Sequence, residues 1–463
     1  MNKIINRNWI NRNIKWHQVD SNFNVDHVSD YAEISASIDH WKNILVQQAN
    51  FGPGSTAVLC ISHRDLRWLS LLFAIWELGG SYVMRHPDYR DVYAPFTVVV
   101  VDHKESTELE TQFTNCVLSL DVWQSYVSNQ APMATQEVAD NLPVIKAISV
   151  APDLSIKLVE YSHAFSSELG KRCVGILDFT PEDHMMHMHG PLHGGGINNM
   201  LLPSLSICKN HYGVIGSFDK MPQIGNFVEQ QGITKISMPN SITTERFIQH
   251  APLFTKPVNI ISMQGNQRNW IEPMKEKNIA SVSSLFGNME TGGPIFVNRL
   301  CMDSADDHDC LNFGFLFDDF YQVKLTNNNQ LEVKNKYQGT TLISDTFNLT
   351  DTGYVFVHRN SYMRINDIIF NVSDLDKIVE SLPCSDLVYL FPDPTMNRVY
   401  LLLDCTIDDP DDIVSTINTE LDKISPLIQV NYVDQQDVGL FKENNRFNEF
   451  QIRNHFRTKF KLR

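Results

Sequence analysis

The sequence predicts an α/β protein with a large N-terminal domain of mainly parallel sheets and a β subdomain, followed by a small α+β domain. Short, nearly continuous apolar runs, typical of strands buried on both faces, alternate with amphipathic helical segments. After about residue 310, apolar and polar residues alternate instead, as in antiparallel strands. With 463 residues the chain is too long for one ordinary core, so more than one domain is expected.

The first half of the chain alternates helices and strands. The spacing of apolar residues predicts a helix over 38–50 and an amphipathic helix over 64–80, which Gly79 and Gly80 end. A further helix is predicted over 221–232. Predicted strands cover residues 56–62, 81–84, 96–102, 211–217 and 233–239. This alternation is what a parallel sheet with crossover helices requires.

The sequence of the second half predicts antiparallel β structure, followed by a separate small domain. Residues 313–340 alternate apolar and polar side chains around the turn sequence TNNNQ. Four elements follow in the order helix, strand, strand, helix, at residues 374–382, 386–393, 398–406 and 411–424. Because the pattern changes at the segment HRNSYMR, we expect domains over 1–360 and 361–463, the second a mobile lid of ordinary domain size.

Composition narrows the class of protein. Lys and Arg number 38 against 54 Asp and Glu, and the net charge of −16 argues against broad binding of nucleic acid or anionic membranes. The N-terminal segment is polar, and Arg67 and Glu77 interrupt the most apolar stretch, so neither a secretory signal nor a membrane span is expected. The 8 cysteines form no C-x-x-C pair, which favours free thiols in a reducing compartment. We therefore expect a cytoplasmic protein.

Two segments carry polar residues suited to binding phosphate or a metal ion. In VAPDLSIKL a loop with Lys157 follows an expected strand and leads to Ser162-His163 at an expected helix start. Backbone N–H groups and a lysine at such a place can hold phosphate oxygens. In FGNMETGG a single carboxylate, Glu290, stands between two glycine turns.

Two further segments complete the set. FNLTDTGYVFVHR places Asp351 and Arg359 on either side of a short apolar strand. HMHGPLHGGG concentrates histidine and glycine before the apolar run MLLPSLS. His187 and His189 would face one side of a strand and could form a metal pair, but no third ligand is evident.

In this order and with these separations, the segments resemble the motifs of the adenylate-forming superfamily, which contains acyl-CoA synthetases, firefly luciferase and the adenylation domains of peptide synthetases. FGNME is similar to the family's Y-G-x-T-E, and GPLHGGG to its P-x-x-H-x-x-G. ISMQGNQRNW, which contains Gly265, is similar to x-x-G-G-x-x-L, and GITKISMPNSI to a strand motif ending V-P-T. The matches are collinear over nearly the whole chain.

The resemblance implies an ATP-dependent ligase. Such enzymes join a carboxylic or amino acid to AMP, release pyrophosphate, and usually pass the acyl group to a thiol of CoA or of carrier-protein phosphopantetheine. By the same resemblance, Glu290 would bind Mg²⁺ and Lys157 would sit on the phosphate loop. The remaining roles are adenine binding for Phe286 and Gly287, ribose binding for Asp351 and Arg359, the acyl pocket for His193 and Gly265, and a catalytic positive charge for Arg446.

Several positions depart from the family pattern. The phosphate loop, normally S-G-T-T-G-x-P-K-G, lacks its glycines and threonines here, and Asp153 adds negative charge where a triphosphate would lie. Met289 replaces the threonine of Y-G-x-T-E. The family's last catalytic lysine aligns with Phe447, with Arg446 next to it and Lys442 five residues earlier. Arg446 could supply a positive charge, but with a different reach and a planar fork.

Because of these departures, two alternatives to the ligase stay open. The chain could be a catalytically reduced relative that binds a nucleotide, an acyl ligand or a partner protein. It could also be a transferase that uses an already activated acyl donor. Taken singly, Glu290 reads as a solvated turn residue, and Asp351 as a turn residue bonded to its own backbone. The sequence does not specify the acid or the acceptor.

Overall fold

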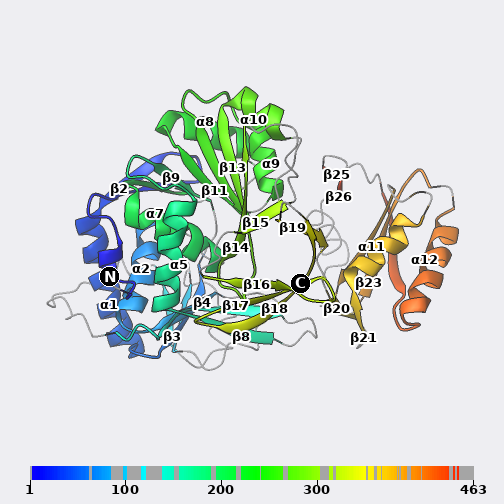
Figure 1. The fold of residues 1–463 in the computed structure, drawn as a ribbon, viewed down its shortest axis with the longest axis horizontal. Helices are drawn as coiled ribbons and strands as arrows, with labels where there is room; N and C mark the ends of the chain where they lie inside the picture. Colours follow the sequence, from blue (N-terminus) through cyan, green and yellow to red (C-terminus); the bar gives the residue numbers. More distant parts are fainter. Residues whose placement is uncertain are drawn as a thin grey trace. The chain divides into compact units, whose positions relative to one another are not determined.

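The computed structural model describes most of the chain in two compact units (Figure 1). The first unit comprises Met1–Ser149, Lys157–Ile343 and Phe347–Val357, and the second Val150–Ile156, Ser344–Thr346 and His358–Arg463. Within them, the described residues are 3–61, 65–84, 97–101, 116–120, 138–150, 156–188, 194–214, 220–239, 241–263, 270–302, 312–315, 320–350, 353–358, 362–365, 368–382, 384, 387–393, 398–407, 409–436, 442–443 and 446–447.

A large sheet with the strand order β16-β17-β18-β19-β15-β14-β13-β12-β11-β9-β10-β1-β2 organises the first unit. Its parallel part runs through β1 (Lys15–Val19), β10 (Asn210–Val214), β9 (His184–His187), β11 (Lys235–Met238), β12 (Val258–Met263) and β13 (Ile279–Gly287). On one flank β2 (Val25–Asp30) pairs antiparallel with β1. The predicted strands at 211–217 and 233–239 are confirmed as β10 and β11.

Beyond β13 the same sheet becomes antiparallel, as the change of pattern predicted. The pairs β13–β14, β14–β15, β15–β19 and β16–β17 are antiparallel. These strands are β14 (Pro294–Cys301), β15 (Asn312–Phe315), β16 (Gln322–Leu325), β17 (Gln330–Asn335), β18 (Gly339–Thr350) and β19 (Gly353–His358).

A second sheet has the order β6-β5-β3-β4-β7-β8. Its members are β3 (Thr56–Cys60), β4 (Ser81–Met84), β5 (Val98–Val101), β6 (Cys116–Ser119), β7 (Pro143–Val150) and β8 (Ile156–Ser162). The pairs β3–β4, β3–β5, β4–β7 and β5–β6 are parallel. All four residues of β5 are buried, as its unbroken apolar sequence predicted.

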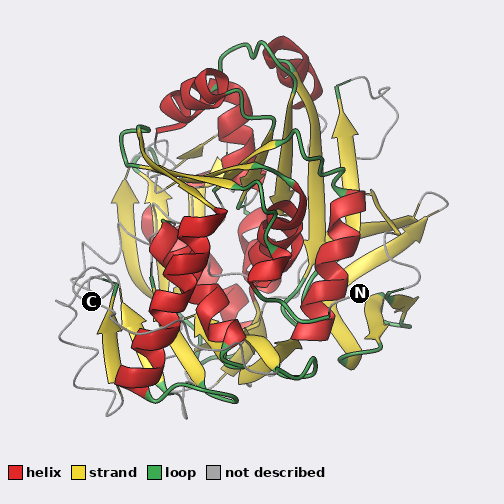
Figure 2. Cartoon of the chain, turned by 90° about the vertical axis from the view of Figure 1, so that its left-hand side faces the viewer, coloured by secondary structure: helices red, strands yellow, loops and turns green. Residues whose placement is uncertain are grey.

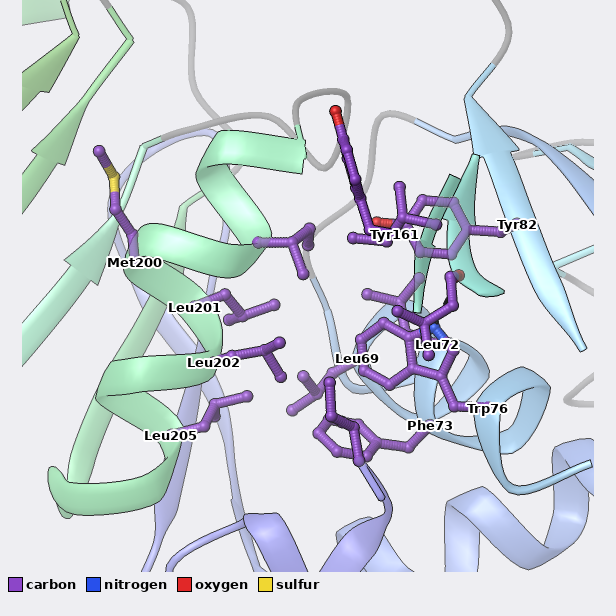
Figure 3. Packing of buried hydrophobic residues seen from close by; sticks show 14 of the residues in the cluster. Leu69, Leu72, Phe73, Trp76, Tyr82, Tyr161, Met200, Leu201, Leu202 and Leu205 are labelled. Atoms are coloured by element: carbon purple, nitrogen blue, oxygen red, sulfur yellow. Dashed lines mark hydrogen bonds between the residues drawn. The ribbon is translucent and has the colours of Figure 1, made fainter. Parts of the chain in front are cut away.

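The main hydrophobic core joins helices to residues of both sheets. Its helices are α1 (Tyr31–Ala49), α2 (Leu66–Glu77), α5 (His163–Ile176) and α7 (Leu202–Ile207), with the π-helical turn Ile197–Leu201 that follows α6 (Gly194–Gly196). Leu201, Leu202 and Leu205 face the apolar side of α2 (Figure 3). The predicted helix over 38–50 begins earlier, at Tyr31, because the Asp30 side chain caps it by accepting from the Glu33 N–H.

A second core covers the opposite face of the large sheet. Consecutive residues of β9 point to opposite faces, so Met185 belongs to the main core and Met186 to the second. The helices of this core are α8 (Met221–Gln231), α9 (Ser241–His250) and α10 (Ile271–Lys277), which lie against the strands in both views (Figures 1 and 2). Gly232, at φ +60°, ends α8 where the sequence predicted.

The second unit is a small α+β structure with its own core. It contains β20 (Tyr362–Ile365), β21 (Ile368–Asn371), α11 (Val372–Glu380), β22 (Val388–Asp393), β23 (Arg398–Asp404), α12 (Pro410–Ile424), β24 (Val430–Gln436), β25 (Lys442–Glu443) and β26 (Arg446–Phe447). The predicted helix–strand–strand–helix order is confirmed, and β24 adds a parallel strand that was not predicted. Among the described residues of the whole chain, no helix has the length and apolarity to cross a bilayer.

Candidate functional site

Residues 288–293, here called the Glu290 turn, connect β13 to β14. Strand pairing before the turn places Phe286 opposite Phe296 and, after a register shift, ends with Gly287 opposite Pro294. Inside the turn, the Asn288 and Thr291 side chains bond reciprocally to the backbone. The Thr291 N–H donates to Asn288 Oδ1 at 3.0 Å, and the Asn288 N–H donates to Thr291 Oγ1 at 3.2 Å. These bonds fix the backbone on both sides of Glu290.

The two glycines that follow Glu290, Gly292 and Gly293, are closely packed. Gly292 has φ +72°, and a Cβ there would lie 2.6 Å from the Phe165 ring. A Cβ on Gly293 would lie 2.3 Å from Leu169. Only glycine permits the first conformation without strain, and a side chain at either position would have to displace Phe165 and Tyr161 or Leu169. The glycine pair therefore seats the turn directly on α5.

Three side chains from separate parts of the sequence hold the Glu290 turn by its backbone carbonyls. Tyr161 comes from β8, Asn198 from the π-helical turn, and Tyr321 from the residue before β16. The Tyr161 hydroxyl donates to the Met289 carbonyl oxygen. The other two acceptors are the carbonyl oxygens of Gly292, 3.1 Å from Asn198 Nδ2, and of Thr291, 2.8 Å from the Tyr321 hydroxyl. We call Tyr161, Asn198 and Tyr321 the carbonyl brace.

Burial keeps both tyrosines of the brace protonated. It raises the pKa of Tyr161, and the nearby Glu290 carboxylate raises it further. Burial likewise raises the pKa of Tyr321 well above its ordinary value. Both hydroxyls therefore remain hydrogen-bond donors at neutral pH. Within the Glu290 turn, Glu290 is the one residue with a carboxylate, and its side chain is half-buried.

Phe286, expected to cover adenine, is a core residue at the end of β13. Its side chain is 6 % exposed. The ring lies edge-on to Phe347, with centroids 5.2 Å apart, and tilted against Phe296 at 6.1 Å. The next residue, Gly287, ends β13, and a Cβ there would lie 2.1 Å from the Gly293 carbonyl oxygen. Phe286 and Gly287 thus directly precede the Glu290 turn.

The other expected site residues lie in different elements. Lys157, expected on a phosphate-binding loop, is the second residue of the strand β8. The predicted helix start at Ser162-His163 is confirmed, because Ser162 caps α5 by accepting from the Phe165 N–H at 3.2 Å. Arg446 begins β26 in the second unit, opposite Glu443 of β25. Four expected site residues lie outside the described residues: His193, Gly265, Asp351 and Arg359.

The histidine considered for metal binding has a structural role. His187 Nε2 lies 3.0 Å from His211 Nδ1 in the core, and both rings stack on Trp16. Burial lowers the pKa of His211 to about 3. His189, the other proposed ligand, lies outside the described residues. Within the described part of the chain, no three His, Cys, Asp or Glu side chains gather as a metal site would require.

The sequence did not single out the carbonyl brace. Tyr161 and Tyr321 lie in ordinary strand-like patterns, with no motif around them. Asn198 and Asn199 could have been identified from the sequence. They are two adjacent amides in the otherwise apolar run GINNMLLP, and amides buried in a core need hydrogen-bond partners.

Solved structures of adenylate-forming enzymes share this fold over nearly the whole chain. An adenylation domain of a keto acid-selecting peptide-synthetase module bound to keto acyl adenylate is 13% identical, with TM-score 0.68, covering 95% of each chain. The anthranilate CoA ligase AuaEII, in complex with anthranoyl-AMP, is 12% identical, with TM-score 0.66, covering 100% of this chain and 99% of that one. A fatty acyl CoA synthetase from Mycobacterium tuberculosis is 10% identical, with TM-score 0.65, covering 96% of each chain.

No family model and no curated protein matches the chain by sequence. The structural likenesses confirm the resemblance to the adenylate-forming superfamily at the level of the fold: a large domain with parallel sheets, further β structure, and a small α+β unit. At these sequence identities, the structural similarity shows a shared fold only.

Proposed function

We propose that this chain is an ATP-dependent ligase that converts a carboxylic or amino acid to an acyl-adenylate and passes the acyl group to a thiol or another acceptor. The Glu290 turn is the observation that carries the proposal. It presents one carboxylate after the carboxyl end of the parallel strand β13, where α/β sheets bind their ligands. A solvated turn glutamate would need neither the three-residue brace nor the packed glycines.

The reaction explains why a braced carboxylate is useful. A carboxylate oxygen of the acid attacks the α-phosphorus of ATP, so the charge of the phosphates must be neutralised and held in line. Mg²⁺, when bound, supplies that neutralisation. It prefers few protein carboxylates and takes its other ligands from water and phosphate. Glu290 fits this need, and the brace would hold its backbone still while the phosphates reorganise.

The remaining roles follow the family pattern. Asp351 and Arg359 would hold the ribose, with Phe286 and Gly287 at the adenine. His193 and Gly265 would line the acid pocket. Two cations, Lys157 and Arg446, would approach the phosphates and the acid. We propose CoA or a carrier-protein phosphopantetheine as the acceptor, and the cytoplasm as the place of action.

A catalytically reduced relative is the second candidate, and the phosphate-binding residues favour it. The segment VAPDLSIKL lacks the family's glycines and threonines and carries Asp153, and Phe447 stands where the family has lysine. Such a protein would keep nucleotide or acyl binding without adenylation. A transferase that accepts a pre-activated acyl donor would also need no intact phosphate loop.

Acid-dependent pyrophosphate release distinguishes these candidates. The protein is incubated with ATP, Mg²⁺ and a broad panel of carboxylic and amino acids, and titrated calorimetrically with ATP·Mg²⁺ and with AMP in separate runs. The ligase releases pyrophosphate with at least one acid. AMP binding without any release supports the reduced relative, and acyl transfer from a supplied acyl-adenylate or acyl-CoA supports the transferase.

A further inference from the structure

Among the described residues, Asn199 is a buried amide without a hydrogen-bond partner. Its side chain is 0 % exposed, and neither Oδ1 nor Nδ2 bonds to any described residue. The Oδ1 atom of the adjacent Asn198 is also buried and unpartnered. Burying unpaired polar atoms destabilises a fold, so three such atoms on neighbouring residues need an explanation beyond packing.

The local backbone points to a functional explanation. Asn198 and Asn199 lie on the π-helical turn Ile197–Leu201. Turns of this kind are rare and occur frequently at functional sites, where the extra residue redirects side chains. Here the turn aims the Asn198 Nδ2 at the Glu290 turn, where it bonds the Gly292 carbonyl oxygen.

The Asn199 amide lies between two glycines, one of which belongs to the Glu290 turn. Its Oδ1 lies 3.2 Å from the position that a Cβ on Gly293 would take. Its Nδ2 lies 3.3 Å from the corresponding position on Gly195, where the Met263 methyl is 3.4 Å away. Met263 is half-buried, and a methionine side chain is unbranched and adaptable. The Gly195 side of the amide, next to this adaptable thioether, is therefore the side from which a ligand would approach.

The surroundings of Asn199 restrict the chemistry of such a ligand. Leu169 and Met263, the side chains that share the Gly293 and Gly195 positions with Asn199, are apolar, and the two glycines add no charge. A charged ligand group would be buried there without a counter-ion, which is costly. A neutral group that both donates and accepts hydrogen bonds would satisfy Oδ1 and Nδ2 together.

We propose that Asn199 determines the acid that the protein selects, and that this acid carries a neutral hydroxyl or carboxamide group on its acyl part. The inference rests on the proposed function, and it narrows the substrate class to acids with such a polar group. An acid with a purely hydrocarbon acyl part would leave the amide unpaired and be selected against.

The test uses pairs of acids that differ in this one feature: benzoate with 4-hydroxybenzoate, and leucine with asparagine. The kcat/KM for pyrophosphate release is measured for the parent, for Asn199→Leu and for Ser167→Ala. The substituted leucine matches asparagine in size. The melting temperature of the Asn199→Leu variant should rise above that of the parent, because the unpaired amide is gone. Ser167, another buried residue with an unpartnered side chain, lies on α5 and serves as the matched control.

The parent should favour the polar member of at least one pair by tenfold or more. Asn199→Leu should abolish or reverse that preference while keeping activity on the apolar member, and Ser167→Ala should leave it unchanged. A parent without such a preference, or a leucine variant that keeps it, overturns the inference while the ligase function stands.

If the parent releases no pyrophosphate with any acid, the ligase function fails and binding decides the inference. Each acid is then added with AMP, and the melting temperature is recorded. A rise with a polar acid that is lost in Asn199→Leu supports the Asn199 site in a non-catalytic protein. No rise with either polar acid overturns it.

Discussion

Replacing Tyr321 with phenylalanine should loosen the Glu290 turn without disturbing the core around it. The ring stays, and only the hydroxyl that donates to the Thr291 carbonyl oxygen at 2.8 Å is lost. Tyr321 is 3 % exposed, so water does not readily replace the lost donor. Losing one partner of a buried hydrogen bond costs about 1–3 kcal/mol. We expect the free energy of unfolding to fall by about that amount.

The same change should weaken the response to Mg²⁺, because the brace positions Glu290. If the whole loss of about 1–3 kcal/mol weakens Mg²⁺ binding at the Glu290 turn, the Mg²⁺ concentration for half-maximal pyrophosphate release rises by about 5- to 150-fold. Urea unfolding gives the stability change, and a Mg²⁺ titration at saturating ATP gives the activity change. AMP binding, measured calorimetrically, should stay within a few-fold of the parent.

Tyr82→Phe is the matched control for this experiment. The Tyr82 hydroxyl is also buried, in a side chain that is 1 % exposed, but it has no hydrogen-bond partner in the described part of the chain. Its removal should leave stability unchanged or raise it, and should leave the Mg²⁺ response unchanged. If Tyr321→Phe behaves like Tyr82→Phe in both measurements, the brace does not position Glu290 and the reasoning is refuted.

Three further predictions concern other parts of the chain. Asp351→Ala should weaken AMP binding by about 1–3 kcal/mol through lost ribose hydrogen bonds, and unchanged calorimetric binding would show the ribose assignment to be wrong. Limited proteolysis should cut between residues 359 and 366 and release a fragment of about 100 residues, and a chain resistant there would contradict the domain boundary at 360. Burial lowers the pKa of His163 to about 4 and of His211 to about 3 from 6.5. As pH is lowered, these histidines are therefore protonated in the unfolded chain at a higher pH than in the folded chain. The free energy of unfolding, at its full value above pH 6.5, should fall by up to about 1.4 kcal/mol per pH unit for each histidine. His211→Gln should flatten this dependence in urea unfolding, and an unchanged slope would contradict it.

The elements of the fold were predictable because their local signals agree with their environment. The run in β5 is apolar because both faces of that strand are buried, and Gly232 ends α8 because it adopts φ +60°. The boundary of α1 was predicted less well. Its first turns, YAEISAS, alternate apolar with polar residues, and the Asp30 cap sets its start.

The candidate site was predictable only in part. Glu290 stands out because the glycines around it are visible in the sequence, and the packing against α5 explains them. The carbonyl brace was not predictable, since Tyr161, Asn198 and Tyr321 meet only through the tertiary fold. Hydrogen bonds between residues so far apart leave no local pattern.

The central claim is that Glu290 serves acyl-adenylate formation, and Glu290→Gln tests it most directly. Glutamine keeps the size of the side chain and removes the charge that Mg²⁺ requires. Acid-dependent pyrophosphate release is measured for both proteins with the acids that the parent uses, together with AMP affinity. The account predicts that the variant releases no pyrophosphate and binds AMP within a few-fold of the parent. A variant that releases pyrophosphate at the parent's rate, or a parent that releases none with any acid, would contradict it.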